Sequence, residues 1–247
     1  MKKLLDWSLE ESNLKCAKIL NPFKTDHIEF VEQADGVFYY ENFLKNKPIA
    51  ENWLKDIKKS KFPKFALITD EKNIPRINSC PSNIIECFNE SLFLEGLALV
   101  IMWGTMTRTK NKIYTKNKNY IEDTIKEIKK KIIEENRIEK AWKLLTENLN
   151  WSNVMSSKFL HFFCRSLGYK NNPPVPIDNA IVKNIIWKEF NLRVGSYSNL
   201  IKPKDWFENN SFESYNRYMT VINYWAKEMS VDNTTIEVSL FNYYQNN

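Results

Sequence analysis

Glycine and histidine are scarce in this chain of 247 residues, which holds 5 glycines and 2 histidines. So few glycines argue against a nucleotide-binding α/β fold, because such folds use glycine-rich turns to bring the backbone close to a phosphate. The cysteines show no CxxC pairing and no metal-ligand spacing, and two histidines leave few ligands for zinc. We therefore expect no metal, no iron–sulfur cluster, no cofactor and four reduced thiols: Cys16, Cys80, Cys87 and Cys164.

A long uninterrupted hydrophobic run is also missing. The longest one, Leu92 to Met106, contains Glu95 and is too short to span a bilayer. Residues 1–5 begin like a secretory signal, but Asp6 interrupts the apolar run at once. These observations predict a cytoplasmic protein with no membrane partner, and we expect a monomer.

The composition indicates a helical protein with a true core. Hydrophobic residues make up 43% of the chain and aromatic residues 14%, and glycine is rare, so a mainly α fold is predicted and disorder is not. The net charge of +6 is compatible with a polyanionic partner but does not establish one.

Apolar spacing divides the chain into a poorly patterned beginning and a helical body. Residues 1–88 are predicted to form an N-terminal extension or cap that can hold short strands, and residues 89–247 the helical body. The predicted strands of the extension are Val37–Tyr40 and Phe65–Ile68, and its predicted helices Leu4–Leu20 and Ile49–Lys58. The body is predicted to contain helices at Ser91–Trp103, within Trp206–Met229 and at Ile236–Tyr244, and an apolar stripe at Ala141–Leu149.

Basic residues are concentrated between Arg108 and Lys143. Acidic residues interleave with the helical part, so i,i+4 pairs such as Glu127 with Lys131 indicate a solvated helix face. The loop Arg108–Lys118 has five bases and no acid, which suits phosphate contacts.

The most informative stretch is Trp151–Trp187. Ser156 or Ser157 is predicted to cap a short apolar helix, which Gly168 ends in a left-handed conformation. Three prolines then hold the chain extended up to Asp178, the predicted N-cap of a helix over Asn179–Phe190. The prolines are Pro173, Pro174 and Pro176.

This stretch resembles the helix-hairpin-helix, Gly/Pro-loop and aspartate module of the HhH-GPD superfamily of DNA glycosylases, in the branch similar to 8-oxoguanine DNA glycosylases. The matching pieces are the turn Asn153–Ser157, Lys158 twenty positions before Asp178, and Val175–Asp178. The turn departs from the family pattern because it contains no glycine. Further similarity lies in Leu97–Gly104 and in the C-terminal helices, so the resemblance covers roughly residues 90 to 244.

The resemblance implies a DNA N-glycosylase that flips a modified base out of double-stranded DNA and removes it, leaving an abasic site. Asp178 would stabilise the positive charge that develops on the deoxyribose. Lys158 would attack the anomeric carbon as a neutral amine, forming a Schiff base that leads to β-elimination (AP-lyase activity). The implied substrate is oxidised guanine. A bulky phage base such as glucosylated hydroxymethylcytosine, removed in anti-phage defence by a bacterial, nucleoid-associated protein, is the other possibility.

Each residue also has a plain structural interpretation. Asp178 fits an ordinary N-cap aspartate, which is commonplace, and Lys158 fits a solvated lysine in a first helical turn. His161 fits a core histidine bonded to backbone as well as a contact with a base or phosphate. Asn179 can donate to a phosphate or only extend the cap, and Ser156 and Ser157 are further candidate DNA contacts. The alternatives to a glycosylase are a non-catalytic helix-hairpin-helix DNA-binding protein and a helical interaction protein with no DNA role.

Overall fold

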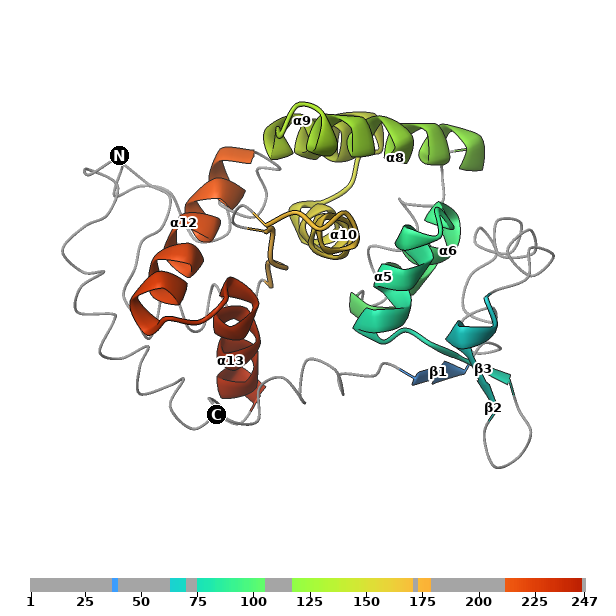
Figure 1. Ribbon diagram of the computed structural model, residues 1–247, viewed down its shortest axis with the longest axis horizontal. Coiled ribbons are helices and arrows are strands. Elements are labelled where there is room, and N and C mark those ends of the chain that lie inside the picture. Colours follow the sequence, from blue (N-terminus) through green and yellow to red (C-terminus); the bar gives the residue numbers. More distant parts are fainter. Residues whose placement is uncertain are drawn as a thin grey trace. The chain divides into compact units, whose positions relative to one another are not determined.

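The computed structural model describes residues 37–39, 63–69, 75–104, 117–170, 173–178 and 212–245 (Figure 1). The chain divides into two compact units, one of Glu32–Lys170 and one of Met1–Val31 with Asn171–Asn247. The described part is mainly helical, which confirms the predicted fold class. The predicted helices at Leu4–Leu20, Ile49–Lys58 and Asn179–Phe190 lie outside the described residues, and the extension or cap at residues 1–88 stays a prediction.

The larger unit begins with a small antiparallel sheet, whose central strand is β3. Its strands are β1 (Val37–Tyr39), β2 (Leu67–Thr69) and β3 (Pro75–Asn78), in the order β1-β3-β2. Ile77 lies opposite Phe38 on one side and Leu67 on the other. The strand predicted at Phe65 starts two residues late, because Lys64–Ala66 form a 3₁₀ turn, η2.

Helices α5 (Pro81–Asn89) and α6 (Phe93–Gly104) follow, and they pack on each other. The prediction that α6 starts at Ser91 is wrong. Ser91 adopts a φ of +61°, and the Leu92 amide donates to the Cys87 carbonyl at 2.8 Å. This Schellman motif ends α5 and delays the next helix to Phe93.

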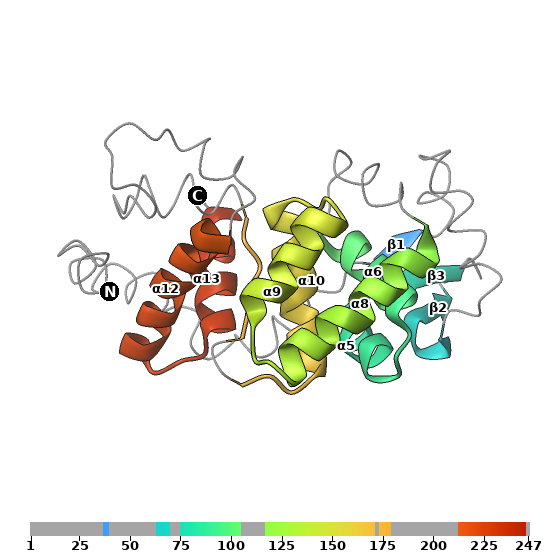
Figure 2. The same cartoon turned by 90° about the horizontal axis from the view of Figure 1, so that it is seen from above.

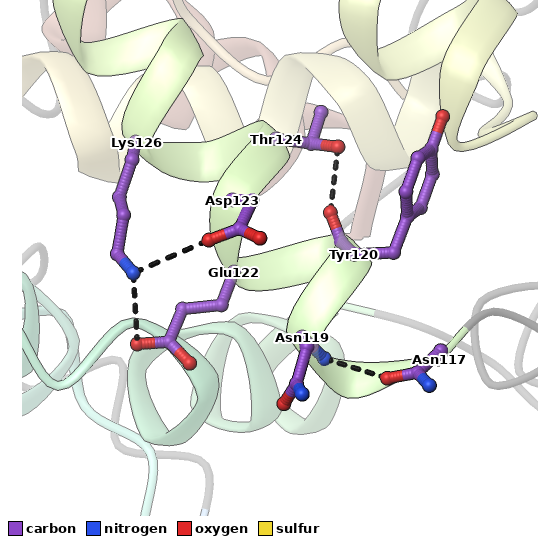
Figure 3. Close-up of polar contacts among 7 residues, drawn as sticks. All are labelled: Asn117, Asn119, Tyr120, Glu122, Asp123, Thr124 and Lys126. Atoms are coloured by element: carbon purple, nitrogen blue, oxygen red, sulfur yellow. Dashed lines mark hydrogen bonds and ion pairs between the residues drawn. The ribbon is translucent and has the colours of Figure 1, made fainter.

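Helix α8 (Lys118–Ile133) lies with α9 (Ile138–Lys143) over one side of α10 (Asn153–Ser166), as Figures 1 and 2 show. The π-helical turn η3 (Leu144–Asn148) joins α9 to the chain that enters α10. In Figure 3, the Asn117 side chain accepts the Asn119 amide at 2.9 Å and caps α8.

Helix α10 is the centre of this unit, because every residue from Met155 to Cys164 is buried. It packs against α5 and α6. Phe88 of α5 meets Phe159 and Phe163 of α10 edge-on, with ring centroids 5.5 and 5.2 Å apart. Gly168 ends the helix at a φ of +65°, as predicted, and the Tyr169 amide donates to the Cys164 carbonyl at 2.9 Å.

The described part of the other unit consists of an extended segment, residues 173–178, and two helices that pack together. These helices are α12 (Phe212–Met229) and α13 (Asn233–Gln245). Helix α12 lies within its predicted region, whereas α13 begins three residues before and ends one residue after the predicted helix Ile236–Tyr244. Ser230, at a φ of +54°, ends α12. Asp232 caps α13 by accepting the Thr235 amide and hydroxyl, both at 2.9 Å. No helix in the described ranges is both long and apolar enough to cross a bilayer.

Candidate active site

Helix α10 begins earlier than the sequence pattern predicts. Its N-cap is Ser152, whose hydroxyl accepts the Met155 amide at 3.4 Å. The prediction that Ser156 or Ser157 caps the helix is therefore wrong, and so is the turn at Asn153–Ser157, because these residues form the first turns of α10. Lys158 accordingly lies in the second turn, still near the positive end of the helix dipole.

Lys158 is buried in this position, with 8% of its surface exposed. Its Nζ atom lies 5.6 Å from the centroid of the Trp103 ring, at the C-terminal end of α6. Trp103 also meets Phe162 of α10 edge-on, at 4.9 Å. The interpretation of Lys158 as an ordinary solvated lysine is thus wrong, because the side chain is buried and its amine lies over one aromatic ring. Burial favours the neutral form of the amine, and the ring face favours the cation.

His161 lies almost one turn after Lys158 and is also buried, with 4% of its surface exposed. Its Nε2 atom is 3.5 Å from Nη1 of Arg165, and its ring meets Phe162 edge-on. If the arginine donates to Nε2, that nitrogen carries no proton and the neutral ring is protonated at Nδ1. A role of His161 at a base or phosphate stays a prediction.

The two serines before Lys158 are fully buried. The Ser157 hydroxyl donates to the Val154 carbonyl at 3.0 Å. Within the described part of the chain, the Ser156 hydroxyl has no hydrogen-bond partner. Their predicted contacts with DNA stay predictions, and Asn179 lies outside the described residues.

Asp178 belongs to the other unit and ends the segment that begins at Pro173. It is partly exposed, whereas the four residues before it are buried. Tyr215 of α12 donates to the Val175 carbonyl at 2.9 Å, and Tyr218 donates to the Pro176 carbonyl at 3.2 Å. The chain that leads into the carboxylate is therefore held by side chains of another element. The predicted N-cap role of Asp178 concerns a helix outside the described residues.

The carboxylate of Asp178 acts electrostatically on its surroundings. Burial raises the pKa of the Tyr218 phenol well above its usual value, and the charges of Glu237, Tyr215 and Asp178 raise it further. Tyr218 is fully buried and Glu237 is 7% exposed. The Tyr218 phenol therefore stays protonated, as a hydrogen-bond donor, throughout the neutral pH range.

The basic residues of α8 and α9 are largely paired with acids, as the interpretation of a solvated helix face predicts. Lys126 contacts Asp123 at 3.3 Å and Glu122 at 3.7 Å (Figure 3). Lys131 pairs with Glu135 at 2.8 Å and not with Glu127, its predicted partner one turn earlier. Most of the predicted phosphate-binding loop Arg108–Lys118, namely residues 108–116, lies outside the described residues.

Burial suppresses the reactivity of two of the described cysteines, Cys87 and Cys164. Cys80, Cys87 and Cys164 are free and buried. Burial, with the charge of Glu95 in second place, raises the pKa of the Cys87 thiol to about 12. Burial alone raises the pKa of Cys164 above its usual range. Neither thiol forms the thiolate that a nucleophile or a metal ligand needs.

The described part of the chain is mainly helical, and it has a buried lysine, Lys158, on a capped helix and an aspartate, Asp178, at the end of an anchored proline segment. Residues 51–241 match the model of the family described as "Putative 8-oxoguanine DNA glycosylase OGG-like protein". Because this match covers more than half of the chain, the protein belongs to the OGG-like family of DNA glycosylases. No curated protein and no solved structure matches the chain.

Proposed function

We propose that this protein is a DNA N-glycosylase in which Asp178 and Lys158 carry out base excision, within the helix-hairpin-helix superfamily. Family membership makes DNA the substrate class. The observation that carries the proposal is the burial of Lys158 beside Trp103. A lysine pays a large desolvation cost in such a place, so a position without function would rarely keep one.

Asp178 serves the first chemical step in this proposal. Breaking the N-glycosidic bond leaves oxocarbenium-like positive charge on the deoxyribose, and a nearby carboxylate stabilises that charge. Asp178 is suited to the role because its carboxylate is partly exposed while the chain before it is fixed. It can also accept the proton of an attacking water or amine.

Lys158 serves as the nucleophile in this proposal. The neutral amine bonds to the anomeric carbon as the bond to the base breaks, and the base leaves with the bonding electrons. After nitrogen loses a proton, the C1′–O4′ bond breaks and O4′ is protonated, which opens the sugar to the iminium (Schiff base) from which β-elimination cuts the strand. The lysine is buried beside the Trp103 ring, and its burial favours the neutral amine.

The substrate proposed first is oxidised guanine, as the family description indicates. The second is a bulky phage base such as glucosylated hydroxymethylcytosine, in a role in anti-phage defence. The absence of glycine between Asn150 and Lys158 supports some divergence from repair enzymes. The family match begins at residue 51, whereas the resemblance begins near residue 90, so part of the N-terminal extension is shared with the family.

The test is base release from three duplexes: one with 8-oxoguanine opposite cytosine, one with glucosylated hydroxymethylcytosine, and an unmodified one. Asp178→Asn should lower base release at least about 100-fold, the loss typical of a group that stabilises transition-state charge, and should keep DNA binding. Asp123→Asn, an exposed aspartate on α8, is the matched control. Full activity of Asp178→Asn would end the assignment of the carboxylate.

Lys158→Gln separates hydrolysis from strand cleavage. Borohydride should trap a covalent adduct between the wild-type protein and the DNA, and it should trap none with Lys158→Gln. Lys170→Gln, an exposed lysine just beyond α10, should be trapped like the wild type. If the wild type forms no adduct but releases base, Lys158 is not a Schiff-base nucleophile. Salt-sensitive DNA binding without any base release would favour the non-catalytic alternative.

A further inference from the structure

The proline segment that ends at Asp178 cannot hold itself in place. Pro173, Pro174 and Pro176 have no backbone N–H, so the segment can form neither a helical turn nor a regular strand ladder. Residues 174–177 are nevertheless buried. Their carbonyl groups must therefore find donors elsewhere, because a buried carbonyl without a partner is costly.

Helix α12 supplies most of the partners from one face. Tyr215, Tyr218 and Met219 are spaced at i, i+3 and i+4, so their side chains point to the same side of the helix. Besides the two tyrosine hydrogen bonds to the carbonyls of Val175 and Pro176, the Met219 sulfur accepts the Val175 amide at 3.5 Å. Val175 is thus held through both its N–H and its C=O.

Helix α13 holds the other end of the segment. The side-chain amide of Asn233 donates to the Pro173 carbonyl at 2.7 Å and to Oδ1 of Asn223 at 3.0 Å. Asn223 lies on α12, so a single amide ties the segment to both helices at the point where they meet. The anchors cover Pro173, Val175 and Pro176, and Asp178 follows two residues later.

We infer that Tyr215 and Tyr218 are positioning residues for Asp178, which they hold in its reactive place through the carbonyls of Val175 and Pro176. The inference rests on the proposed function, because it assigns a task to the carboxylate that the proposal makes catalytic. Two phenols suit this task, since each rigid ring reaches across the helix interface with a single donor at its tip. Because both rings are buried, water cannot replace a lost hydroxyl without a cavity for it.

The test compares Tyr215→Phe, Tyr218→Phe and the double variant with the wild type, in the full chain. Each change removes one oxygen and keeps the ring. Base release is measured in single turnover at saturating protein, with the two modified duplexes named above, and DNA affinity is measured separately. Displacing a catalytic group by about 1 Å can cost about 100-fold in rate. We expect a loss of about 10-fold for each single variant and about 100-fold for the double variant, with unchanged DNA affinity.

Ile222→Val is the control for stability. Ile222 is fully buried on α12 and has no polar atom with which to hold the segment. Its truncation lowers stability by an amount similar to that of a lost hydrogen bond. A purely structural role of the tyrosines would lower the midpoint of unfolding and leave the rate of the folded protein unchanged, as in Ile222→Val. Hydrogen exchange of the peptide 173–178 supplies a measurement that needs no substrate, and it should be faster in both tyrosine variants than in Ile222→Val.

The outcomes separate the inference from the proposed function. If the wild type releases base and Asp178→Asn does not, but both tyrosine variants react like Ile222→Val, the inference is wrong and the proposed function stands. If the wild type releases no base from any duplex, the proposed function fails and the positioning role fails with it. Slower release by the tyrosine variants at unchanged affinity, with faster exchange of the segment, supports the inference.

Discussion

Gly96 is the position at which the packing of α6 against α5 can be tested most sharply. A Cβ atom at this residue would lie 2.6 and 2.8 Å from two ring carbons of Phe88 and 3.0 Å from a third. Phe88 is 2% exposed and is held edge-on by Phe159 and Phe163 of α10, the helix that carries Lys158. The ring therefore has little freedom to give way to a methyl group.

Two effects oppose each other in Gly96→Ala. Alanine favours the helix over glycine by about 1 kcal/mol. Overpacking a well-filled core costs about 1–3 kcal/mol, and the fixed Phe88 ring places this site near the upper end. We expect Gly96→Ala to lower the free energy of unfolding by about 1–2 kcal/mol, measured by urea unfolding followed by circular dichroism.

The companion variants identify the cause. Phe88→Leu removes the ring that the new methyl group would meet, so Gly96→Ala should cost less in that background, or become stabilising. Gly168→Ala serves as a contrast, because nothing lies within 4 Å of a Cβ there and only the φ of +65° opposes the change. A neutral or stabilising Gly96→Ala in the wild-type background would refute the steric argument.

Four further variants test other parts of the structure. Ser152→Ala should lower the free energy of unfolding by about 1 kcal/mol, because it removes the cap of α10. Ser156→Ala should be neutral or stabilising, because the buried Ser156 hydroxyl lacks a described partner. Urea unfolding of both variants shows whether Ser152→Ala is the less stable of the two. Ser230→Gly should stabilise by about 1 kcal/mol, seen as a higher thermal midpoint, because glycine accepts the φ of +54° without strain. Hydrogen bonds from Lys131 and Lys140 lower the pKa of Glu135 to about 2. The contribution of this carboxylate to stability is therefore present above about pH 4.5 and is lost as the pH falls towards 2. When the free energy of unfolding is measured against pH, Glu135→Gln should lack this loss of stability.

The positions of several helices could be predicted because their apolar residues recur with a clear period. Tyr215, Tyr218, Ile222 and Trp225 mark the buried face of α12, and all four are buried. A glycine just after an apolar helical pattern predicts that the helix ends there in the left-handed conformation, and Gly168 adopts that conformation. Ser91 ends α5 in the same way, but serine carries no such signal, so the start of α6 was predicted two residues too early.

The start of α10 could not be located from the sequence for a different reason. Ser152, Asn153, Ser156 and Ser157 are all good N-cap residues, and the helix is buried on nearly every face. When a helix has no polar stripe, the spacing of its apolar residues does not show at which residue the helix begins. The choice of Ser152 depends on the left-handed conformation of Asn150, whose φ is +55°, and on the packing of Trp151 against Phe159 at 5.5 Å.

In the candidate site, too, the sequence motif predicts some features, whereas other features depend on packing between distant parts of the chain. The spacing of Lys158 and Asp178 follows from the sequence, and the family match supports the glycosylase class that the resemblance of this stretch implies. The Trp103 ring beside Lys158 comes from a residue 55 positions earlier in the chain, and no local pattern connects the two. The two tyrosines that hold the proline segment come from about 40 positions later. Their spacing on α12 is that of any buried helix face, so it predicted burial but not their hydrogen bonds.

The partners of the two proposed catalytic residues have different physical tasks. Lys158 needs an environment that removes water, because burial favours the neutral amine, and the Trp103 ring is part of that environment. Asp178 needs access to the substrate together with a fixed backbone, because its charge acts over a few ångströms and loses effect with displacement. A segment rich in proline is stiff but cannot form its own hydrogen-bond ladder, so side chains of α12 and α13 must complete it. The burial of Tyr215, Tyr218, Met219 and Asn233 around residues 173–176 is therefore the structural cost of placing one carboxylate.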